Sequence, residues 1–289
     1  MNLPNLLIVG AAKSGTTSLH NYLKQHPDIY MSNQKEPHFL INNEIGVNRI
    51  PKGINNLQDY SNLFSNGISH KYRGESSAMY LQFPEIAIKN IDRYLDEDVK
   101  IIIMLRNPIE RAFSGYQHVK RYNLDEDLDF EDAFEISEQR YFTNNNITPA
   151  SRYIHIGMYN EFVRKFKTKF KTNVHIIIYK DFINNTNQEL SRLFSFLGIK
   201  DVQIDFNKQY MVGGWKWKND LFRKIFMKRH FLKKFIPFKR LIRAAFKLFA
   251  TDSVEKIDDT IREKLIGIYK DDIKNLSTFL NIDLNFWTK

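Results

Sequence analysis

The stretch from Gly10 to Ser18 contains the first residues whose types and spacing suggest chemistry. It reads GAAKSGTTS, and it lies between an apolar run, Leu6–Val9, and a segment with helical periodicity. A strand that passes through a glycine-bracketed loop into a helix N-terminus aims backbone N–H groups at an anion. The pattern therefore predicts a phosphate cradle. The alternative is a tight strand-to-helix turn that needs its glycines for steric reasons alone.

The position of the lysine distinguishes this loop from a nucleoside-triphosphate loop. Gly10 and Gly15 have the spacing of a Walker A loop, but Thr16 stands where such a loop carries lysine. The lysine lies inside the loop instead, at Lys13. The sequence thus keeps an anion cradle without the lysine that reaches the β- and γ-phosphates. A Mg²⁺-dependent small-molecule kinase remains the alternative enzyme.

Arg106 and Ser114, near the middle of the chain, are candidates for a second anion site. Arg106 follows Lys100–Leu105, a run with three consecutive isoleucines that is typical of a buried parallel strand. Open α/β sheets bind ligands at the carboxyl ends of their strands. Ser114 lies near the start of the next expected helix, and an arginine with a hydroxyl can hold a terminal phosphate. The alternatives are a strand-end salt bridge for Arg106 and a helix-surface position for Ser114.

Three motifs, in chain order, resemble those of the PAPS-dependent sulfotransferases, in particular the bacterial and glycan-type branch. GAAKSGTTSLHNYLKQHP from Gly10 resembles the family's 5′-phosphosulfate loop, and KEPHF at 35–39 resembles its KEP-x-F motif. LRNPIERAFSGY at 105–116 resembles its 3′-phosphate motif. GESS at 74–77 and the end of the chain, 268–287, are weaker matches. The resemblance covers essentially all of 1–289.

The resemblance implies a reaction and assigns roles to residues. The donor would be 3′-phosphoadenylyl sulfate (PAPS), the product adenosine 3′,5′-bisphosphate (PAP), and no metal would be required. Lys13 would stabilise charge on the bridging oxygen, and Glu36 would be the general base, with His38 as its competitor. Arg106 and Ser114 would hold the 3′-phosphate. The 5′-phosphate would lie on the loop residues Lys13, Ser14, Gly15, Thr16, Thr17 and Ser18.

Two segments depart from the family pattern. Ser76 stands where glycan sulfotransferases often carry lysine in a GEKS-like motif. The loop from Met211 to Asn219 resembles the family's nucleotide-closing loop without its Arg-Lys-Gly. In this loop Trp215 would cover the adenine, and Lys216 or Lys218 would contact the 3′-phosphate. The alternative for this loop is an exposed basic linker.

The spacing of apolar residues indicates the elements that carry these groups. Strands are expected at Leu6–Val9, Ile29–Met31, Lys100–Leu105 and Val174–Tyr179. Segments with helical periodicity alternate with them, at Thr17–Gln25, Pro84–Tyr94, Ile109–Lys120, Tyr159–Phe170 and Asn187–Leu197. This alternation predicts an α/β, P-loop-NTPase-like open parallel sheet flanked by helices. We expect one sulfotransferase domain over 1–289, with the α/β core at about 1–206. The nucleotide-closing loop and a C-terminal helical extension, helical from Asn219 onward, would occupy about 207–289.

Charge and composition limit the function further. The 289 residues include no cysteine, which excludes a disulfide scaffold, a thiolate metal site and a cysteine nucleophile. The net charge is +10, and Lys208–Lys247 contains 13 Lys or Arg against one acid. Overlapping this segment, the apolar residues of Leu221–Phe249 recur at near-helical spacing, which favours a core-facing stripe with a solvated basic back. A lid, or a peripheral membrane contact through 219–249, is the alternative.

The remaining expectations concern partners and location. The acceptor would be a hydroxyl or amine of a glycan or small-molecule natural product. No nucleic-acid-binding motif is present, so we expect no nucleic-acid partner, although a non-enzymatic basic module that binds nucleic acid or anionic lipid is a further alternative. Neither a leader segment nor a transmembrane run is visible in the sequence, which predicts a cytoplasmic protein.

Overall fold

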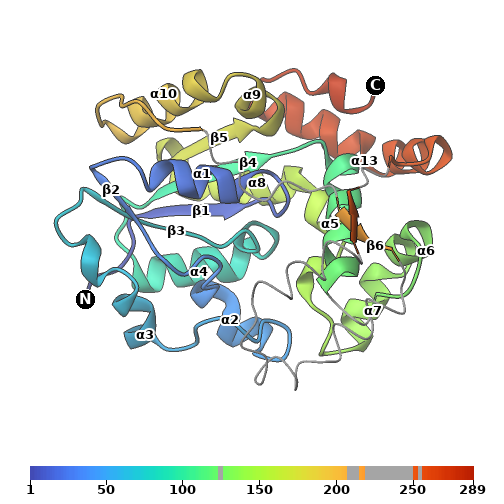
Figure 1. The fold of residues 1–289 in the computed structure, drawn as a ribbon, viewed down its shortest axis with the longest axis horizontal. Helices are drawn as coiled ribbons and strands as arrows, with labels where there is room; N and C mark the ends of the chain where they lie inside the picture. The colour runs from blue at the N-terminus through green and yellow to red at the C-terminus, as the bar shows by residue number, and fades with distance from the viewer. Residues whose placement is uncertain (123–125, 207–214, 219–249, 253–255) are drawn as a thin grey trace.

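Five parallel strands form the central sheet of the protein (Figure 1). The computed structural model describes residues 1–122, 126–206, 215–218, 250–252 and 256–289. The strands lie in the order β2-β3-β1-β4-β5. Their bounds are β1 (Leu6–Gly10), β2 (Ile29–Met31), β3 (Tyr72–Ser76), β4 (Lys100–Leu105) and β5 (Val174–Ile178). The predicted fold class, an open parallel sheet flanked by helices, is confirmed.

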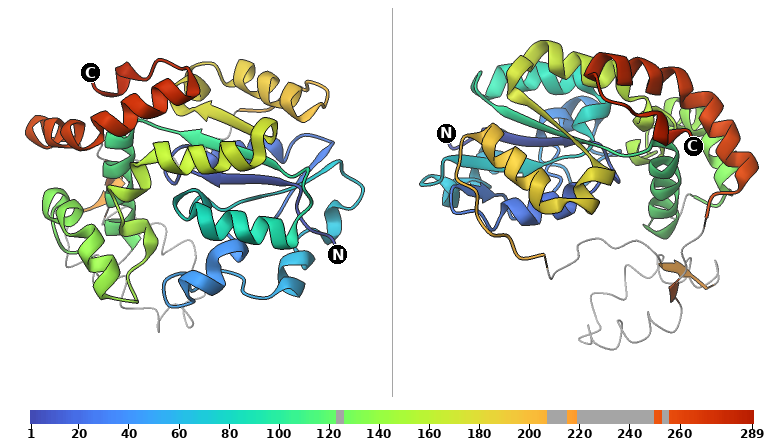
Figure 2. Two further views of the ribbon diagram at one scale, coloured as in Figure 1. Left: turned by 180° about the vertical axis from the view of Figure 1, so that it is seen from behind. Right: turned by 90° about the horizontal axis from the view of Figure 1, so that it is seen from above.

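Helices cover both faces of this sheet. One face packs against α1 (Thr16–Leu23), α9 (Tyr179–Asn184) and α10 (Thr186–Leu197). The other packs against α4 (Pro84–Tyr94), α5 (Pro108–Tyr122), α8 (Tyr159–Phe170) and α13 (Asp259–Leu280). Figure 2, left, shows α4 in teal and α8 in yellow-green in front of the sheet. Shorter helices complete the described part: α2 (Phe39–Ile45), α3 (Leu57–Asn62), α6 (Phe130–Glu135) and α7 (Ser137–Thr143).

The alternation of side chains along each strand divides the core in two. Leu6 and Ile8 of β1 belong to the cluster with α1 and α10, whereas Leu7 and Val9 belong to the cluster with α4 and α8. Successive side chains of a strand point to opposite faces, so a central strand covered on both sides must be apolar throughout. All five residues of β1 are buried. This explains why the continuous apolar runs of the sequence are strands.

The carboxyl ends of the parallel strands lie at one edge of the sheet. From β1 the chain passes to β2 and β3 on one side and later to β4 and β5 on the other. The loops after β1 and β4 therefore diverge at the point where the strand order reverses, which is where open α/β sheets bind ligands. There the Arg106 Nη1 donates to the carbonyl oxygen of Lys13 at 3.3 Å.

The structure also differs from the sequence-based expectations. β3 was not predicted, because its residues YRGES lack the apolar pattern of the other strands. Trp215–Trp217 (β6) pairs antiparallel with Ala250–Asp252 (β7), so 250–252 is strand where helix was expected. The helices predicted within 219–249 lie outside the described residues. No helix in the described ranges is long and apolar enough to cross a bilayer.

Candidate functional site

A cleft of about 1130 Å³ opens at the carboxyl edge of the sheet. Its walls come from the loops after β1, β2, β3 and β4 and from α5, α9 and the start of α13. Cationic side chains dominate its charged lining, at Lys13, Lys35, Arg106, Arg111, Arg121, Lys256 and Arg262, against the acids Glu36, Glu110 and Asp259. The cleft is therefore suited to a strongly anionic ligand.

The loop after β1 has the backbone of an anion cradle. Lys13 and Gly15 lie in the left-handed region, with φ of 70° and 88°. A Cβ on Gly15 would lie 3.0 Å from the ring of Tyr179, so this position needs glycine for its φ and for its close approach to the ring. Gly15 precedes α1 and provides no capping side chain, so the positive end of the helix dipole faces the cleft without a cap from Gly15.

Lys13 lines this cleft in an environment of like charge. Burial, together with the nearby Arg121, Arg106, Lys35 and Arg111, lowers the pKa of its ammonium to about 8. A cation held among other cations is stabilised by an anionic partner. This observation on the chain's own residues fits a ligand that carries phosphate or sulfate groups.

The predicted 5′-phosphate residues divide into two groups in the structure. Gly15, Thr16, Thr17 and Ser18 line the cleft with Lys13. Ser14 is fully buried and is not among the cleft-lining residues. Its hydroxyl therefore faces the protein interior, while its backbone remains part of the loop.

Arg106 and Ser114 both line the cleft, as the sequence predicted for a common site. The guanidinium of Arg106 lies over the ring of Tyr179 at 5.0 Å and donates from Nε and Nη2 to Glu110 Oε2, at 3.3 and 3.2 Å. The hydroxyl of Tyr159 donates to the Arg106 carbonyl oxygen at 3.0 Å. Arg106 is thus held next to the loop lysine, with Glu110 as its carboxylate partner.

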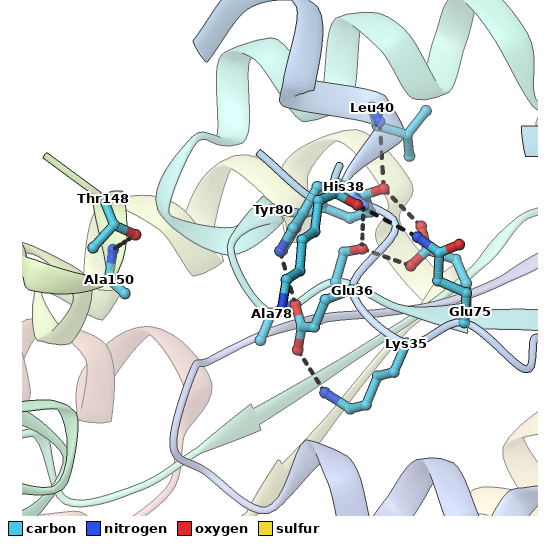
Figure 3. Close-up of polar contacts among 12 residues, drawn as sticks. Lys35, Glu36, His38, Leu40, Glu75, Ala78, Tyr80, Thr148 and Ala150 are labelled. Carbon is cyan, nitrogen blue, oxygen red and sulfur yellow. Dashed lines mark hydrogen bonds and ion pairs between the residues drawn. The ribbon is translucent and has the colours of Figure 1, made fainter. Parts of the chain in front are cut away.

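Glu36 and His38 meet in the segment between β2 and α2, and both line the cleft (Figure 3). Glu36 Oε1 lies 2.5 Å from Lys35 Nζ, and Oε2 accepts from the Ala78 amide at 2.9 Å. His38 Nε2 lies 3.2 Å from the same Oε2. Burial raises the pKa of the Glu36 carboxyl, but Lys35, His38 and the Ala78 amide outweigh it and hold the pKa below its usual value. Glu36 is therefore ionised at neutral pH.

The two candidate bases differ in their access to the cleft. The side chain of Glu36 is 34% exposed and that of His38 is 6% exposed. Burial lowers the pKa of His38 although Glu36 opposes the shift, so the imidazole is neutral at neutral pH. The geometry thus places Glu36 at the surface of the cleft and His38 behind it, in contact with its carboxylate.

Three groups that carried no assigned role in the sequence are prominent in the structure. Lys35 pairs directly with Glu36. Arg111 is fully buried at the cleft and donates from Nη2 to the Tyr153 carbonyl oxygen. Glu75 is fully buried beside the KEPHF loop, and burial raises the pKa of its carboxyl to about 7. The sequence signals for Lys35 and Glu75 were their places in KEPHF and GESS.

The predicted nucleotide-closing residues are only partly described. Lys218 is exposed. Trp215 and Lys216 lie in β6, and their side chains fall outside the described residues. Their roles therefore stay predictions. Within the described ranges, no group of three or more His, Cys, Asp or Glu is arranged to hold a metal ion.

Comparisons with known proteins agree with this geometry. A sulfotransferase from Alicyclobacillus acidocaldarius superimposes with a TM-score of 0.76 at 27% identity, over 100% of both chains. A sulfotransferase domain from a Synechococcus olefin synthase shares the fold, with a TM-score of 0.51 at 17% identity over 98% of this chain and 97% of that one.

Curated relatives match a smaller part of their own length. Mouse carbohydrate sulfotransferase 15 is 23% identical over 249 residues, covering 68% of this chain and 44% of the relative. Human bifunctional heparan sulfate N-deacetylase/N-sulfotransferase 2 is 28% identical over 200 residues, covering 68% and 22%. This chain thus spans less than half the length of these relatives. The family described as sulfotransferase domain matches residues 3–268, and the chain therefore belongs to the sulfotransferase family.

Proposed function

We propose that the protein transfers a sulfuryl group from PAPS to a hydroxyl or amine of a glycan or small-molecule acceptor. The observation that carries the proposal is the meeting of Lys13, Glu36 and Arg106 in one cleft, from three different strand ends. A reaction of this kind depends mainly on positioning and on charge stabilisation. The similarity to a carbohydrate sulfotransferase and to a heparan sulfate N-sulfotransferase favours a glycan acceptor.

PAPS would supply a sulfuryl group on a phosphate leaving group, and its two anionic ends need two sites. Lys13 and the N-terminus of α1 would bind the 5′ end, and Lys13 would stabilise the charge that develops on the departing phosphate oxygen. Arg106 and Ser114 would bind the 3′-phosphate. Trp215 and either Lys216 or Lys218 would close over the nucleotide. The lysine position that distinguishes this loop from Walker A disfavours the kinase alternative.

Glu36 would accept the proton that the acceptor loses as it attacks. It is ionised, more exposed than His38, and held by Lys35 and the Ala78 amide. His38 would donate a hydrogen bond from Nε2 to the Glu36 carboxylate and orient it. His38 remains the competing base, because the two side chains are in contact.

The same proposal covers domain organisation and partners. Residues 1–289 would form one sulfotransferase domain, supported by the packing of α13 on α8 and α5. We propose a cytoplasmic enzyme that requires no metal and binds no nucleic acid. Contact with an anionic membrane through 219–249 is the alternative for the basic segment, which lies outside the described residues.

A ligand screen followed by a transfer assay tests this function. PAP should raise the melting temperature with or without chelator, whereas ATP with Mg²⁺ should not. Radiolabelled sulfate should then pass from PAPS to unsulfated heparan-type or other oligosaccharides, or to a panel of hydroxylated small molecules. Stabilisation by ATP with Mg²⁺ and not by PAP would favour the kinase. Saturable, salt-sensitive binding to a duplex or to anionic vesicles, with no nucleotide effect, would favour the non-enzymatic module.

A further inference from the structure

A carboxylate lies buried at the end of β3, behind the candidate base. Glu75 is fully buried, and both of its oxygens accept hydrogen bonds from hydroxyls (Figure 3). Oε1 accepts from Tyr60 at 3.1 Å and from Tyr80 at 2.7 Å, and Oε2 accepts from Ser77 at 2.8 Å. A buried carboxylate is costly even when it is hydrogen-bonded. Its presence in the core next to the cleft therefore calls for an explanation.

The carboxylate determines which way the neighbouring hydroxyls point. The hydroxyls of Ser77 and Tyr80 both donate to Glu75, so their hydrogens point toward its carboxyl oxygens. Their oxygen lone pairs are then free to face the opposite direction. There the Ser77 Oγ accepts from the His38 amide at 3.0 Å, and the Tyr80 hydroxyl accepts from the Leu40 amide at 3.3 Å. Two hydroxyls thus connect Glu75 to the backbone of the KEPHF loop, at His38, and of the first turn of α2, at Leu40.

This loop has a backbone that needs such support. Glu36 and His38 lie in the left-handed region, with φ of 59° and 53°, on either side of Pro37. Non-glycine residues rarely adopt this region, and a proline further restricts the residue before it. α2 starts at Phe39, and His38 provides no capping side chain. The Tyr80 hydroxyl therefore satisfies one of the N–H groups of the first turn of α2 from outside the helix.

We propose that Glu75 is a positioning residue, which holds the Glu36–His38 loop in its reactive conformation through Ser77 and Tyr80. The inference rests on the proposed function, since it concerns the placement of the proposed base. Glu75 itself is fully buried and is separated from the cleft by the residues that it holds. Removing a link should let the loop relax and move the Glu36 carboxylate away from the acceptor. PAP affinity should stay unchanged, because the anion sites lie on other loops.

The two tyrosines offer a matched pair of variants. Both are fully buried, and both donate to Glu75 Oε1. Only Tyr80 also accepts, in the described contacts, from an amide of the first turn of α2, that of Leu40. Tyr80→Phe should lower kcat by about 10- to 100-fold, the range for a base displaced by up to about 1 Å. Tyr60→Phe removes a comparable hydrogen bond and should change kcat by no more than about two-fold.

Amide hydrogen exchange at His38 and Leu40 measures the stability of these backbone contacts independently of activity. Tyr80→Phe should speed exchange at Leu40, and Ser77→Ala should speed it at His38, whereas Tyr60→Phe should leave both unchanged. Glu75→Gln replaces one of the two acceptor oxygens with an NH2 donor, which leaves at least one hydroxyl facing a donor, so it should lower kcat and speed exchange at His38 or Leu40. If Glu75→Gln does not fold, the two tyrosine variants still decide the question.

The outcomes separate this inference from the proposed function. Equal effects of Tyr80→Phe and Tyr60→Phe on both kcat and exchange would overturn the positioning role. A loss of PAP affinity as large as the loss of kcat in Tyr80→Phe would overturn it too, because the network would then support the whole cleft. If the wild-type protein neither binds PAP nor transfers sulfate while the variants change amide exchange as expected, Glu75 still positions the loop and the proposed reaction is wrong.

Discussion

Arg106→Ala should weaken PAP binding selectively, through loss of the contact with the 3′-phosphate. A hydrogen bond to a charged group contributes about 1.5–3 kcal/mol. In the free protein, however, the guanidinium is paired with Glu110, whose side chain is 48% exposed. Such an exposed i,i+4 pair contributes about 0.3–0.5 kcal/mol, which must be given up on binding. The expected net loss is about 1–2.7 kcal/mol, roughly 5- to 90-fold in Kd.

Isothermal titration with two nucleotides measures this loss. PAP carries the 3′-phosphate and adenosine 5′-monophosphate lacks it, so only PAP should lose affinity in Arg106→Ala. Glu110→Gln is the matched control, because it removes the competing carboxylate and keeps the arginine. It should tighten PAP by up to about two-fold.

The comparison of the two nucleotides also distinguishes direct binding of the 3′-phosphate by Arg106 from an indirect effect through the 5′ loop. The Arg106 Nη1 donates to the Lys13 carbonyl oxygen, so truncation of Arg106 can disturb the 5′ loop. Equal losses for PAP and adenosine 5′-monophosphate would show that Arg106 supports this loop and does not bind the 3′-phosphate. Unchanged PAP affinity would place the 3′-phosphate elsewhere in the cleft.

Three further predictions concern the base and two perturbed pKa values. Glu36→Gln should lower turnover by about 10²–10⁴-fold with little change in PAP affinity, as expected when a general base is lost. If instead His38→Ala loses turnover while Glu36→Gln keeps it, the base is His38. Because the free Lys13 ammonium has a pKa of about 8 and a bound phosphate raises that pKa, PAP affinity should be highest below pH 8 and fall as pH rises past it. Lys13→Met should flatten this fall in titrations at several pH values, and an unchanged slope would contradict the role of Lys13. The pKa of Glu75 is about 7 in the folded protein and 4.5 ordinarily. The native state therefore binds more protons than the unfolded state between these pH values. As a result, the free energy of unfolding should fall by up to about 3 kcal/mol as pH rises from 4.5 to 7. Urea denaturation of Glu75→Gln should lack this decline, and a decline equal to that of the wild type would assign it to other groups.

Local patterns in the sequence were sufficient to predict much of the fold. The runs at β1, β2, β4 and β5 are apolar because a parallel sheet covered on both faces buries every side chain. β3 was not predicted because three of its buried positions, Gly74, Glu75 and Ser76, are not large apolar residues. Glu75 is tolerated there by hydroxyls from α3 and from the segment after β3, which no local pattern reveals.

In the candidate site, too, some features could be predicted from the sequence and others could not. The motifs at Lys13, Glu36 and Arg106 follow strands, and parallel strands end at one edge, so their convergence on one cleft was predictable. The side-chain directions were not. Ser14 was expected to face the phosphate, yet its hydroxyl is buried in the interior. The pairing of β6 with β7 also joins segments that are far apart in the sequence.

The sequence by itself determined which chemical groups stand at the strand ends, because strand periodicity, glycine placement and motif spacing are local properties of the chain. Only the tertiary structure decided their electrostatic states. The Glu36 carboxylate is kept ionised by Lys35 and by the amide of Ala78 from a different strand end, while burial brings the pKa of Lys13 to about 8. Lys35 is the sequence neighbour of Glu36, but the burial of Glu36 and Lys13 and the contact with the Ala78 amide depend on segments that are remote in sequence and meet only after the chain has packed.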